Sequence, residues 1–341
     1  MEKKTIALTG WWTGWHIFPL LSIYNYLKED NNYKFLWIWE ETGLEADIAE
    51  KNNIEFHDIA AGKIRRYFDW RNFYEPLKNF TGIFQWIYYI WKYKIDIIFS
   101  KWWFVSLPLC LAGRMMRKKI YIHESDIKIW LANKIISKFA TKIFTSFPKE
   151  WKKVITTWQI LNPELLEWLK DLIIKENKKL KILVIAGSQG STIIFENLVK
   201  IIWDLPNIEF EIILWEKNKH FREKLNIFTN TKVYDFVSQK ELWIIYKNTD
   251  IAITRGSATT LSELFFFWIH SIIIPITNAW NHQIYNAKYY NEKYWSDILD
   301  ENKNLSLELF RKIKSYQNLR KKDLNLQWFF NAMKIIEKEI K

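Results

Sequence analysis

The chain has 341 residues, which is long enough for two domains with separate hydrophobic cores. Its hydrophobic content of 49% and charged content of 26% are ordinary for a globular protein, and no stretch approaches the ~18 uninterrupted apolar residues of a membrane span. A net charge of +12 favours an acidic partner, and a single cysteine, Cys110, excludes an internal disulfide and a cysteine metal cluster. The first residues lead straight into a strand without the apolar region of a signal peptide, which predicts a cytoplasmic chain.

Apolar runs of strand type alternate with helical patterns, which predicts an α/β fold with parallel sheets. The strands expected in the first half are Thr5–Leu8, Tyr33–Ile38, Ile54–Ile59, Ile95–Ser100, Lys119–His123 and Lys142–Thr145, with a long helix at Tyr74–Lys94. The charged helical stretch Asn162–Lys179 then marks the crossing between domains. A second cycle has strands at Lys181–Ala186, Glu209–Leu214, Thr231–Tyr234, Ile251–Thr254 and Ser271–Pro275. We therefore expect two facing Rossmann-like domains with a ligand between the carboxyl ends of their sheets.

The run TGWWTGWHIFP, at residues 9–19, follows the first expected strand and begins a helix. Phosphate-cradling turns at this place need residues without a Cβ atom, and the three tryptophans of the run prevent that. Read as glycines, they give a glycine-rich turn with His16 at the helix start, where an imidazole tends to stay neutral and able to accept a proton. Glu124 ends a later strand and would face the same cleft.

Composition supports the same substitution. The nine glycines are about 3% of the chain, against about 7% in average proteins, and the nine glycines and 21 tryptophans together number 30, about 9%. We infer that a codon read here as tryptophan, UGA, encodes glycine in the natural protein. The alternative is a protein truly rich in tryptophan, such as a sugar-stacking lectin. The glycine interpretation predicts positive φ, or crowding of the cleft, at several of eight tryptophans: Trp11, Trp12, Trp15, Trp102, Trp103, Trp130, Trp158 and Trp268.

Three segments of the second half place polar residues at strand-to-helix turns. GSQGS, at residues 187–191, could hold a diphosphate at a helix N-terminus, or be a plain turn with a capping serine. TRGSATTLSEL, at residues 254–264, carries Glu263, which could accept both hydroxyls of a ribose or be a solvated helix residue. NHQIYNA, at residues 281–287, suits sugar hydroxyls. No Asp-x-Asp pair occurs and the histidines lack metal-ligand spacing, so a bound metal is not expected.

With tryptophan read as glycine, the ordered segments TGWWTGWHIFP, SKWWFVSLP, HESDIKIWLAN, AGSQGS, TRGSATTLSEL and NHQIYNA resemble the motifs of the MurG glycosyltransferases. The match runs from about residue 5 to residue 300. It implies a GT-B fold and an inverting, metal-independent transfer of N-acetylglucosamine from UDP-N-acetylglucosamine to undecaprenyl-diphosphoryl-N-acetylmuramoyl-pentapeptide, with no cofactor and no nucleic-acid partner. It also implies a peripheral enzyme at the cytoplasmic face of the cell membrane.

The resemblance further implies roles for individual residues. Glu263 is similar to the ribose-binding carboxylate, Val237 to the backbone position at uracil, and His16 to an acceptor-side histidine that is a candidate base, with Glu124 beside it. The other donor-side positions are Thr13, Gly14, Ser188, Gln189, Gly190, Arg255, His282, Gln283 and Asn286, and the acceptor-side positions are Trp12, Trp15, Trp102, Trp103 and Asp126. Two departures stand out: the family usually has asparagine in place of Asp126, and it has an arginine near a Gly-Asn-Pro turn where this chain reads TWQILN, ending at Asn162.

The expected domains are residues 1–160 with a C-terminal helix at about 326–340, which bind the acceptor, and residues 161–325, which bind the donor. Phe80, Ile83, Phe84 and Ile87 have helical spacing with Arg65, Arg66, Lys78 and Lys92 around them, so this helix could rest on an anionic membrane or pack on its own sheet. Two other functions stay open from the sequence. One is a different GT-B glycosyltransferase that uses a UDP-sugar and a lipid acceptor, and the other is a non-enzymatic sugar-binding protein rich in tryptophan.

Overall fold

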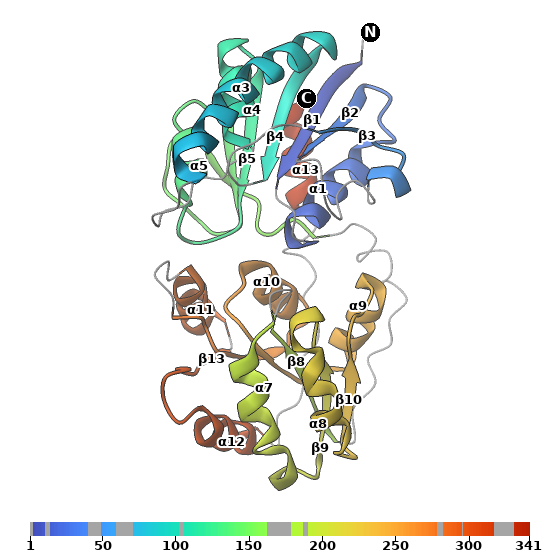
Figure 1. Ribbon diagram of the computed structural model, residues 1–341, viewed down its shortest axis with the longest axis vertical. Coiled ribbons are helices and arrows are strands. Elements are labelled where there is room, and N and C mark those ends of the chain that lie inside the picture. The colour runs from blue at the N-terminus through green and yellow to red at the C-terminus, as the bar shows by residue number, and fades with distance from the viewer. Residues whose placement is uncertain are drawn as a thin grey trace. The chain divides into compact units, whose positions relative to one another are not determined.

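The computed structural model describes residues 3–10, 14–39, 49–58, 71–101, 106–161, 179–186, 190–277, 282–294, 296–316 and 331–341. The chain divides into two compact units (Figure 1). Unit 1 comprises Met1–Pro163 and Phe329–Lys341, and unit 2 comprises Glu164–Trp328.

Unit 1 is built, within the described residues, on a seven-stranded parallel sheet in the order β3-β2-β1-β4-β5-β6-β7. Its strands are β1 (Lys4–Gly10), β2 (Tyr33–Trp39), β3 (Glu55–Asp58), β4 (Ile95–Lys101), β5 (Lys119–Glu124), β6 (Lys142–Thr145) and β7 (Val154–Thr156). The strand order reverses between β1 and β4, and open α/β sheets bind ligands beyond the carboxyl ends of the strands at such a reversal.

Helices cover both faces of this sheet (Figure 1). Alternate side chains of β1 point to opposite faces. Ile6 therefore packs in one core with α1 (Gly14–Leu27) and α13 (Asn331–Ile340), whereas Ala7 packs in the other with α3 (Arg71–Lys92), α4 (Ser106–Met115) and α5 (Leu131–Ile136).

Where the structure describes unit 2, it repeats the plan with a six-stranded parallel sheet in the order β10-β9-β8-β11-β12-β13. The strands are β8 (Leu180–Ile185), β9 (Ile208–Ile213), β10 (Thr231–Tyr234), β11 (Ile251–Thr254), β12 (His270–Ile273) and β13 (Ser296–Ile298). The helices are α7 (Thr192–Val199), α8 (Arg222–Asn226), α9 (Gln239–Asn248), α10 (Ala258–Phe266), α11 (His282–Lys293) and α12 (Leu305–Ser315), with 3-10 turns η1 (Ile202–Asp204) and η2 (Glu216–Phe221). The order reverses between β8 and β11, so the carboxyl ends of these strands are the edge where this sheet is expected to bind a ligand, called its ligand-binding edge below.

The predicted fold class is confirmed, and each predicted strand overlaps an observed one. Two edge strands were missed, β7 and β13, because each has three residues and neither has a continuous apolar run. The predicted helix at residues 162–179 lies almost entirely outside the described residues, as does the start of the predicted C-terminal helix at residues 326–330.

Among the described residues, three tryptophans have a positive φ: Trp158 (φ 62°), Trp215 (φ 60°) and Trp268 (φ 52°). Trp268 follows the end of α10, where its N–H bonds to the carbonyl of Phe265 and the next N–H, of Ile269, bonds to the carbonyl of Leu264. This closing turn is the usual place for glycine, because an L-residue is strained there. Positive φ was thus expected, and is found, at Trp158 and Trp268, and Trp215 adds a position that the sequence did not single out.

Positive φ or crowding of the cleft is not found at every tryptophan for which it was predicted. Trp130 has an ordinary φ of −74°. Trp268 precedes the amino end of β12, the edge opposite the ligand-binding edge, so the expected crowding of the cleft is wrong there. Trp11, Trp12, Trp102 and Trp103 lie outside the described residues, and Trp15 is described for its backbone alone.

Candidate functional site

The ligand-binding edge of unit 2 begins with a turn that requires glycine. Gly190 follows β8 with φ 67°, and a Cβ atom on it would lie 1.8 Å from Oδ1 of Asn218. The same Asn218 oxygen accepts the backbone N–H of Ser191 at 2.9 Å, and Ser191 caps α7 by accepting the N–H of Ile194. Asn218 therefore holds the turn against the start of α7, whose N-terminal N–H groups are suited to an anion.

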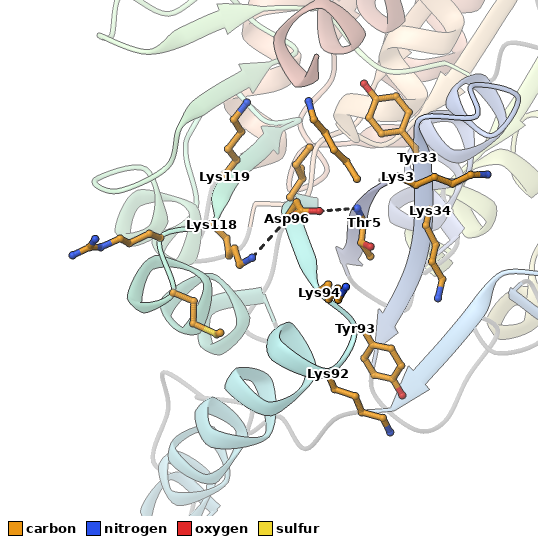
Figure 2. A pocket seen from close by; sticks show the side chains of 14 residues that line it. Lys3, Thr5, Tyr33, Lys34, Lys92, Tyr93, Lys94, Asp96, Lys118 and Lys119 are labelled. Carbon is orange, nitrogen blue, oxygen red and sulfur yellow. Dashed lines mark hydrogen bonds and ion pairs between the residues drawn. The ribbon is translucent and has the colours of Figure 1, made fainter. Parts of the chain in front are cut away.

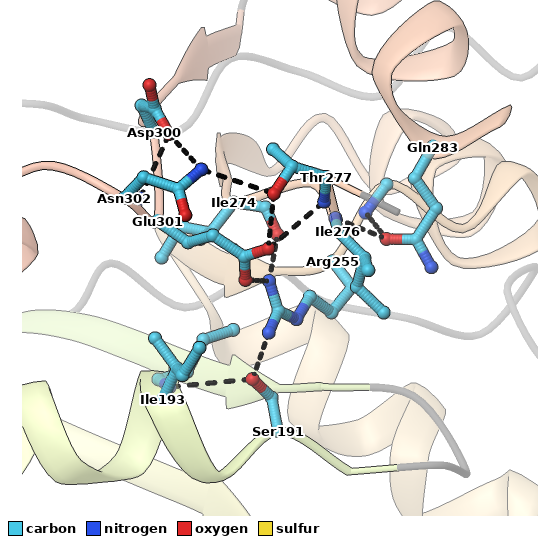
Figure 3. Close-up of polar contacts among 12 residues, drawn as sticks. Ser191, Ile193, Arg255, Ile274, Ile276, Thr277, Gln283, Asp300, Glu301 and Asn302 are labelled. Atoms are coloured by element: carbon cyan, nitrogen blue, oxygen red, sulfur yellow. Dashed lines mark hydrogen bonds and ion pairs between the residues drawn. The ribbon is translucent and has the colours of Figure 1, made fainter. Parts of the chain in front are cut away.

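Arg255, directly after β11, ties this turn to the strands beside it (Figure 3). Its guanidinium donates to Oγ of Ser191 at 2.6 Å, to the carbonyl of Ile274 at 2.9 Å and to Glu301 at 2.6 Å. Burial raises the pKa of Glu301, but hydrogen bonds from Thr277 and the pairing with Arg255 outweigh it, so that pKa is lowered overall. The buried ion pair joins the carboxyl ends of β8, β11, β12 and β13 into one polar network.

Gly256 and α11 form a second close contact at this edge. A Cβ atom on Gly256 would lie 2.4 Å from the backbone oxygen of Gln283, so the turn accepts only glycine without movement. Oε1 of Gln283 accepts the N–H groups of Gly256 and Ile276, each at 3.1 Å, and the buried Asn286 amide donates to the carbonyl of Gly256 at 3.1 Å. In this structure both amides hold the turn after β11 in place, and His282 begins the same helix.

Glu263 lies within α10 and is 8% exposed. Burial raises the pKa of its carboxyl to about 8, although the hydroxyl of Tyr246, which donates to Oε2 at 3.0 Å, opposes that rise. Glu263 is therefore a buried acid rather than a solvated helix residue. Val237 is also buried, just before Ser238 and Glu241 form a capping box at the start of α9. Next to it Phe236 is 70% exposed and lies against the indole of Trp215 at 5.7 Å between ring centroids.

Unit 1 places a carboxylate and an ammonium together at its own ligand-binding edge. Glu124, at the end of β5, is 1% exposed and accepts the N–H groups of Asp126 and Trp130 and the amide of Asn133, at 3.0 to 3.3 Å. Burial and the neighbouring charge of Asp126 raise its pKa. Asp126 in turn accepts the indole N–H of Trp130 at 2.8 Å. Glu124 thus fixes the loop between β5 and α5.

Lys101 ends β4 and is fully buried. Burial lowers the pKa of its ammonium to about 7, although Glu124 and Asp126 act in the opposite direction. Its Nζ has no hydrogen-bond partner among the described residues. His123 is also fully buried: burial and the charge of Lys101 hold its pKa well below the usual value, and its neutral ring contacts the carbonyl of Trp158 through Nε2 at 3.3 Å.

The structure therefore brings together Gly190, Arg255, Gln283 and Asn286 at one edge of unit 2, and Glu124 and Asp126 at one edge of unit 1. Six predicted residues lie outside the described part: Trp12, Thr13, Trp102, Trp103, Ser188 and Gln189. Gly14, Trp15 and His16 are described only as the first residues of α1. Sequence reasoning missed Lys101, Asn218, Tyr246 and Glu301. Only Lys101 carried a signal, because it directly follows an expected buried strand.

Comparison with known proteins identifies the family. Residues 6–145 match the glycosyltransferase family 28 N-terminal domain, and residues 181–328 match the glycosyltransferase family 28 C-terminal domain. A relative from Clostridium perfringens (strain SM101) is 33% identical over 337 residues, which cover 95% of this chain and 93% of the relative. Its name is UDP-N-acetylglucosamine--N-acetylmuramyl-(pentapeptide) pyrophosphoryl-undecaprenol N-acetylglucosamine transferase, as is that of a Clostridium kluyveri relative with 32% identity over 97% of this chain.

The chain belongs to glycosyltransferase family 28, among the MurG enzymes. It is a hexosyltransferase. The fold is similar to that of the family member MurG from Acinetobacter baumannii, with a TM-score of 0.73 and 19% identity over 98% of this chain and 95% of that one. It is also similar in fold to a UDP-GlcNAc 2-epimerase from Neisseria meningitidis, with a TM-score of 0.68, 13% identity and 99% of both chains covered.

The described residues of this family member contain no helix that is both long and apolar enough to cross a membrane. Nor do they contain a group of three or more histidine, cysteine, aspartate or glutamate residues that could hold a metal ion.

Proposed function

We propose that this enzyme transfers N-acetylglucosamine from UDP-N-acetylglucosamine to undecaprenyl-diphosphoryl-N-acetylmuramoyl-pentapeptide. The observation that carries the proposal is the identity of about one third, over nearly the whole chain, with transferases named for that reaction. Unit 2 binds the donor and unit 1 binds the acceptor in this proposal, with inversion at the transferred sugar and no metal.

The donor site of the proposal lies at the ligand-binding edge of unit 2. The Gly187–Ser191 turn and the N-terminus of α7 bind the diphosphate through N–H groups, which also stabilise the charge of the departing UDP. Arg255 and Asn218 hold that turn in place. Glu263 accepts the ribose hydroxyls, and the hydrogen bond from Tyr246 keeps its buried carboxyl oriented. The backbone at Val237 recognises uracil, and the free amide hydrogens of Gln283, with His282, contact the sugar.

The acceptor site lies at the ligand-binding edge of unit 1. His16 takes the proton of the acceptor hydroxyl, because a neutral imidazole at a helix start is suited to that step. Glu124 acts as a positioning residue, since both of its oxygens already accept N–H groups. Lys101 supplies a cation for the acceptor diphosphate, because it is buried at the carboxyl end of β4 and its Nζ has no partner within the described residues.

Helix α3 mediates peripheral attachment to the cytoplasmic face of the membrane in this proposal. Its Trp86 and Ile90 are buried against the sheet, and Ile83 and Ile87 pack beside them, which agrees with the alternative of a helix packed on its own sheet. The exposed stripe is instead Phe84 (60%), Tyr88 (50%) and Trp91 (70%). Lys92 at the end of the helix lies over the ring of Tyr88, which is suited to an anionic membrane surface.

The test is transfer of radiolabelled N-acetylglucosamine to the lipid-linked acceptor by two proteins, one with the printed sequence and one with glycine at the eight tryptophans named above. We expect transfer by the glycine protein and little or none by the other. In the glycine protein, Glu263→Ala should weaken binding of UDP-N-acetylglucosamine by about 1–3 kcal/mol, because buried ribose hydroxyls lose their acceptor. Glu223→Ala, on the exposed surface of α8, is the control. No transfer by the glycine protein, or unchanged affinity in Glu263→Ala, contradicts the proposal.

A further inference from the structure

A basic pocket lies in unit 1 at the amino ends of the strands, the edge opposite the proposed acceptor site. It encloses about 1010 Å³ and is lined by the starts of β1, β2, β4 and β5 and by the turns after α3 and α4. Eight of its lining side chains are cationic and one, Asp96, is acidic, which gives it a net charge of +7, whereas the whole chain carries +12. More than half of the excess charge is therefore concentrated at one edge of one sheet, so a lysine-rich composition does not explain it.

The carboxylate of Asp96 is engaged within the protein. One oxygen accepts the backbone N–H of Thr5 at 3.1 Å, which ties β1 to β4, and the other lies 3.8 Å from Nζ of Lys118 (Figure 2). Lys34 pairs at 3.0 Å with Glu55, which is outside the pocket, and Lys4 donates to the terminal backbone oxygen of Lys341. Within the described residues, Lys3, Arg117 and Lys119 have no ion pair. They are exposed and line the same pocket from two places, the residue before β1 and the junction of α4 with β5.

Like charges held close together repel, and a bound anion removes that repulsion. Lysine binds phosphate as a point charge and arginine binds it through two parallel N–H groups, so the mixture suits phosphate oxygens. Eight cations spread over a pocket of about 1010 Å³ suit an anion with more than one phosphate, because the pocket is large enough for a ligand of nucleotide size.

We propose that this amino-edge pocket binds an anion that carries two or more phosphate groups, at a site separate from both proposed substrate sites. The phosphates belong either to a soluble polyphosphorylated molecule or to the headgroups of an anionic lipid surface. Asp96 is engaged with the backbone N–H of Thr5 and with Lys118, and the three unpaired cations bind the ligand. The proposal does not depend on the proposed function, because none of these residues belongs to the transfer site.

The experiment measures binding of inorganic tripolyphosphate to the full chain by calorimetry. The variant Lys3→Gln/Arg117→Gln/Lys119→Gln removes the three unpaired cations, and Lys51→Gln/Lys134→Gln/Lys138→Gln removes the same charge from exposed positions of unit 1 outside the pocket. We expect the pocket variant to weaken binding about tenfold, because three exposed ion pairs are lost, and the control to change it by less than about twofold. Added salt should weaken binding to the unmodified chain.

A second arm identifies the source of the phosphates. Sedimentation with phosphatidylcholine vesicles, with and without phosphatidylglycerol, is compared for the same three proteins. Loss of binding to the anionic vesicles in the pocket variant alone assigns the pocket to lipid headgroups, and unchanged vesicle binding together with weakened tripolyphosphate binding assigns it to a soluble ligand. Absence of tripolyphosphate binding, or an equal loss in both variants, overturns the proposal. Circular dichroism of each variant verifies that its fold is intact.

Discussion

Replacement of Trp215 by glycine should stabilise the protein. Trp215 follows β9 with φ 60° and ψ 170°, a combination almost restricted to glycine, which costs a tryptophan about 1–3 kcal/mol. Its indole N–H is buried without an acceptor among the described residues, which costs about 1–3 kcal/mol more. Two costs reduce this gain. Loss of the ring contact with Phe236 costs about 0.5–1.5 kcal/mol, and the greater freedom of glycine in the unfolded chain costs about 0.5–1 kcal/mol. The midpoints of these terms give a net gain of about 2 kcal/mol in the free energy of unfolding.

Trp215→Ala separates the two causes, because alanine removes the indole but keeps a Cβ atom in the strained backbone. Urea unfolding followed by far-ultraviolet circular dichroism suits the comparison, since loss of an indole alters fluorescence. The glycine variant should exceed the alanine variant by about 1 kcal/mol, because the backbone strain of about 1–3 kcal/mol is partly offset by the greater freedom of glycine in the unfolded chain. Trp243→Gly, at a core position that is 2% exposed, should instead destabilise by about 3–5 kcal/mol. An alanine variant as stable as the glycine variant would refute the reasoning about Trp215.

Three other predictions concern the buried charges of the two units. Burial raises the Glu263 pKa from 4.5 to about 8, so between these pH values the folded state keeps a proton that the unfolded state loses. The contribution of the protonated Glu263 carboxyl to stability is therefore complete below about pH 4.5 and is lost as pH rises through about 8. Glu263→Gln should flatten that decline in urea unfolding measured across this range, and an unchanged slope would contradict it. Glu301→Gln should reduce the unfolding free energy by about 3–5 kcal/mol, because it leaves the Arg255 guanidinium buried without its carboxylate; a loss below about 1 kcal/mol would show that the pair contributes little. Lys101→Met should raise the melting temperature at neutral pH and impair transfer. It should also remove the rise in stability between about pH 7 and 10.5, where the unfolded state keeps the Lys101 proton that the folded state has lost. A Met variant that is less stable than the unmodified protein would show that the buried ammonium is not uncompensated.

The strands of both sheets could be predicted from the sequence because parallel strands buried on both faces are continuous apolar runs. Lys142–Thr145, Thr231–Tyr234 and Ile251–Thr254 were predicted with their observed bounds. Alternation of these runs with helices was enough for two Rossmann-like folds. The edge strands β7 and β13 were missed because a three-residue edge strand, buried on fewer sides, needs no such run. The positive φ of Trp158 and Trp268 was also foreseen, since strain of this kind follows from residue type and local turn context.

The residues of the candidate site could be predicted from the sequence only in part. Glu263, Arg255 and the glycine turns could be named from the sequence, because each follows a strand at the edge where ligands bind. Only the tertiary structure showed that Arg255 is paired with Glu301, 46 residues later, and that Asn218 holds Ser191 from 27 residues away. It also showed that Glu263 and Lys101 are buried, with pKa values shifted in opposite directions. Local patterns determine strands and turns, whereas burial and pairing of charge depend on which distant segments fold against each other, and no local pattern encodes that.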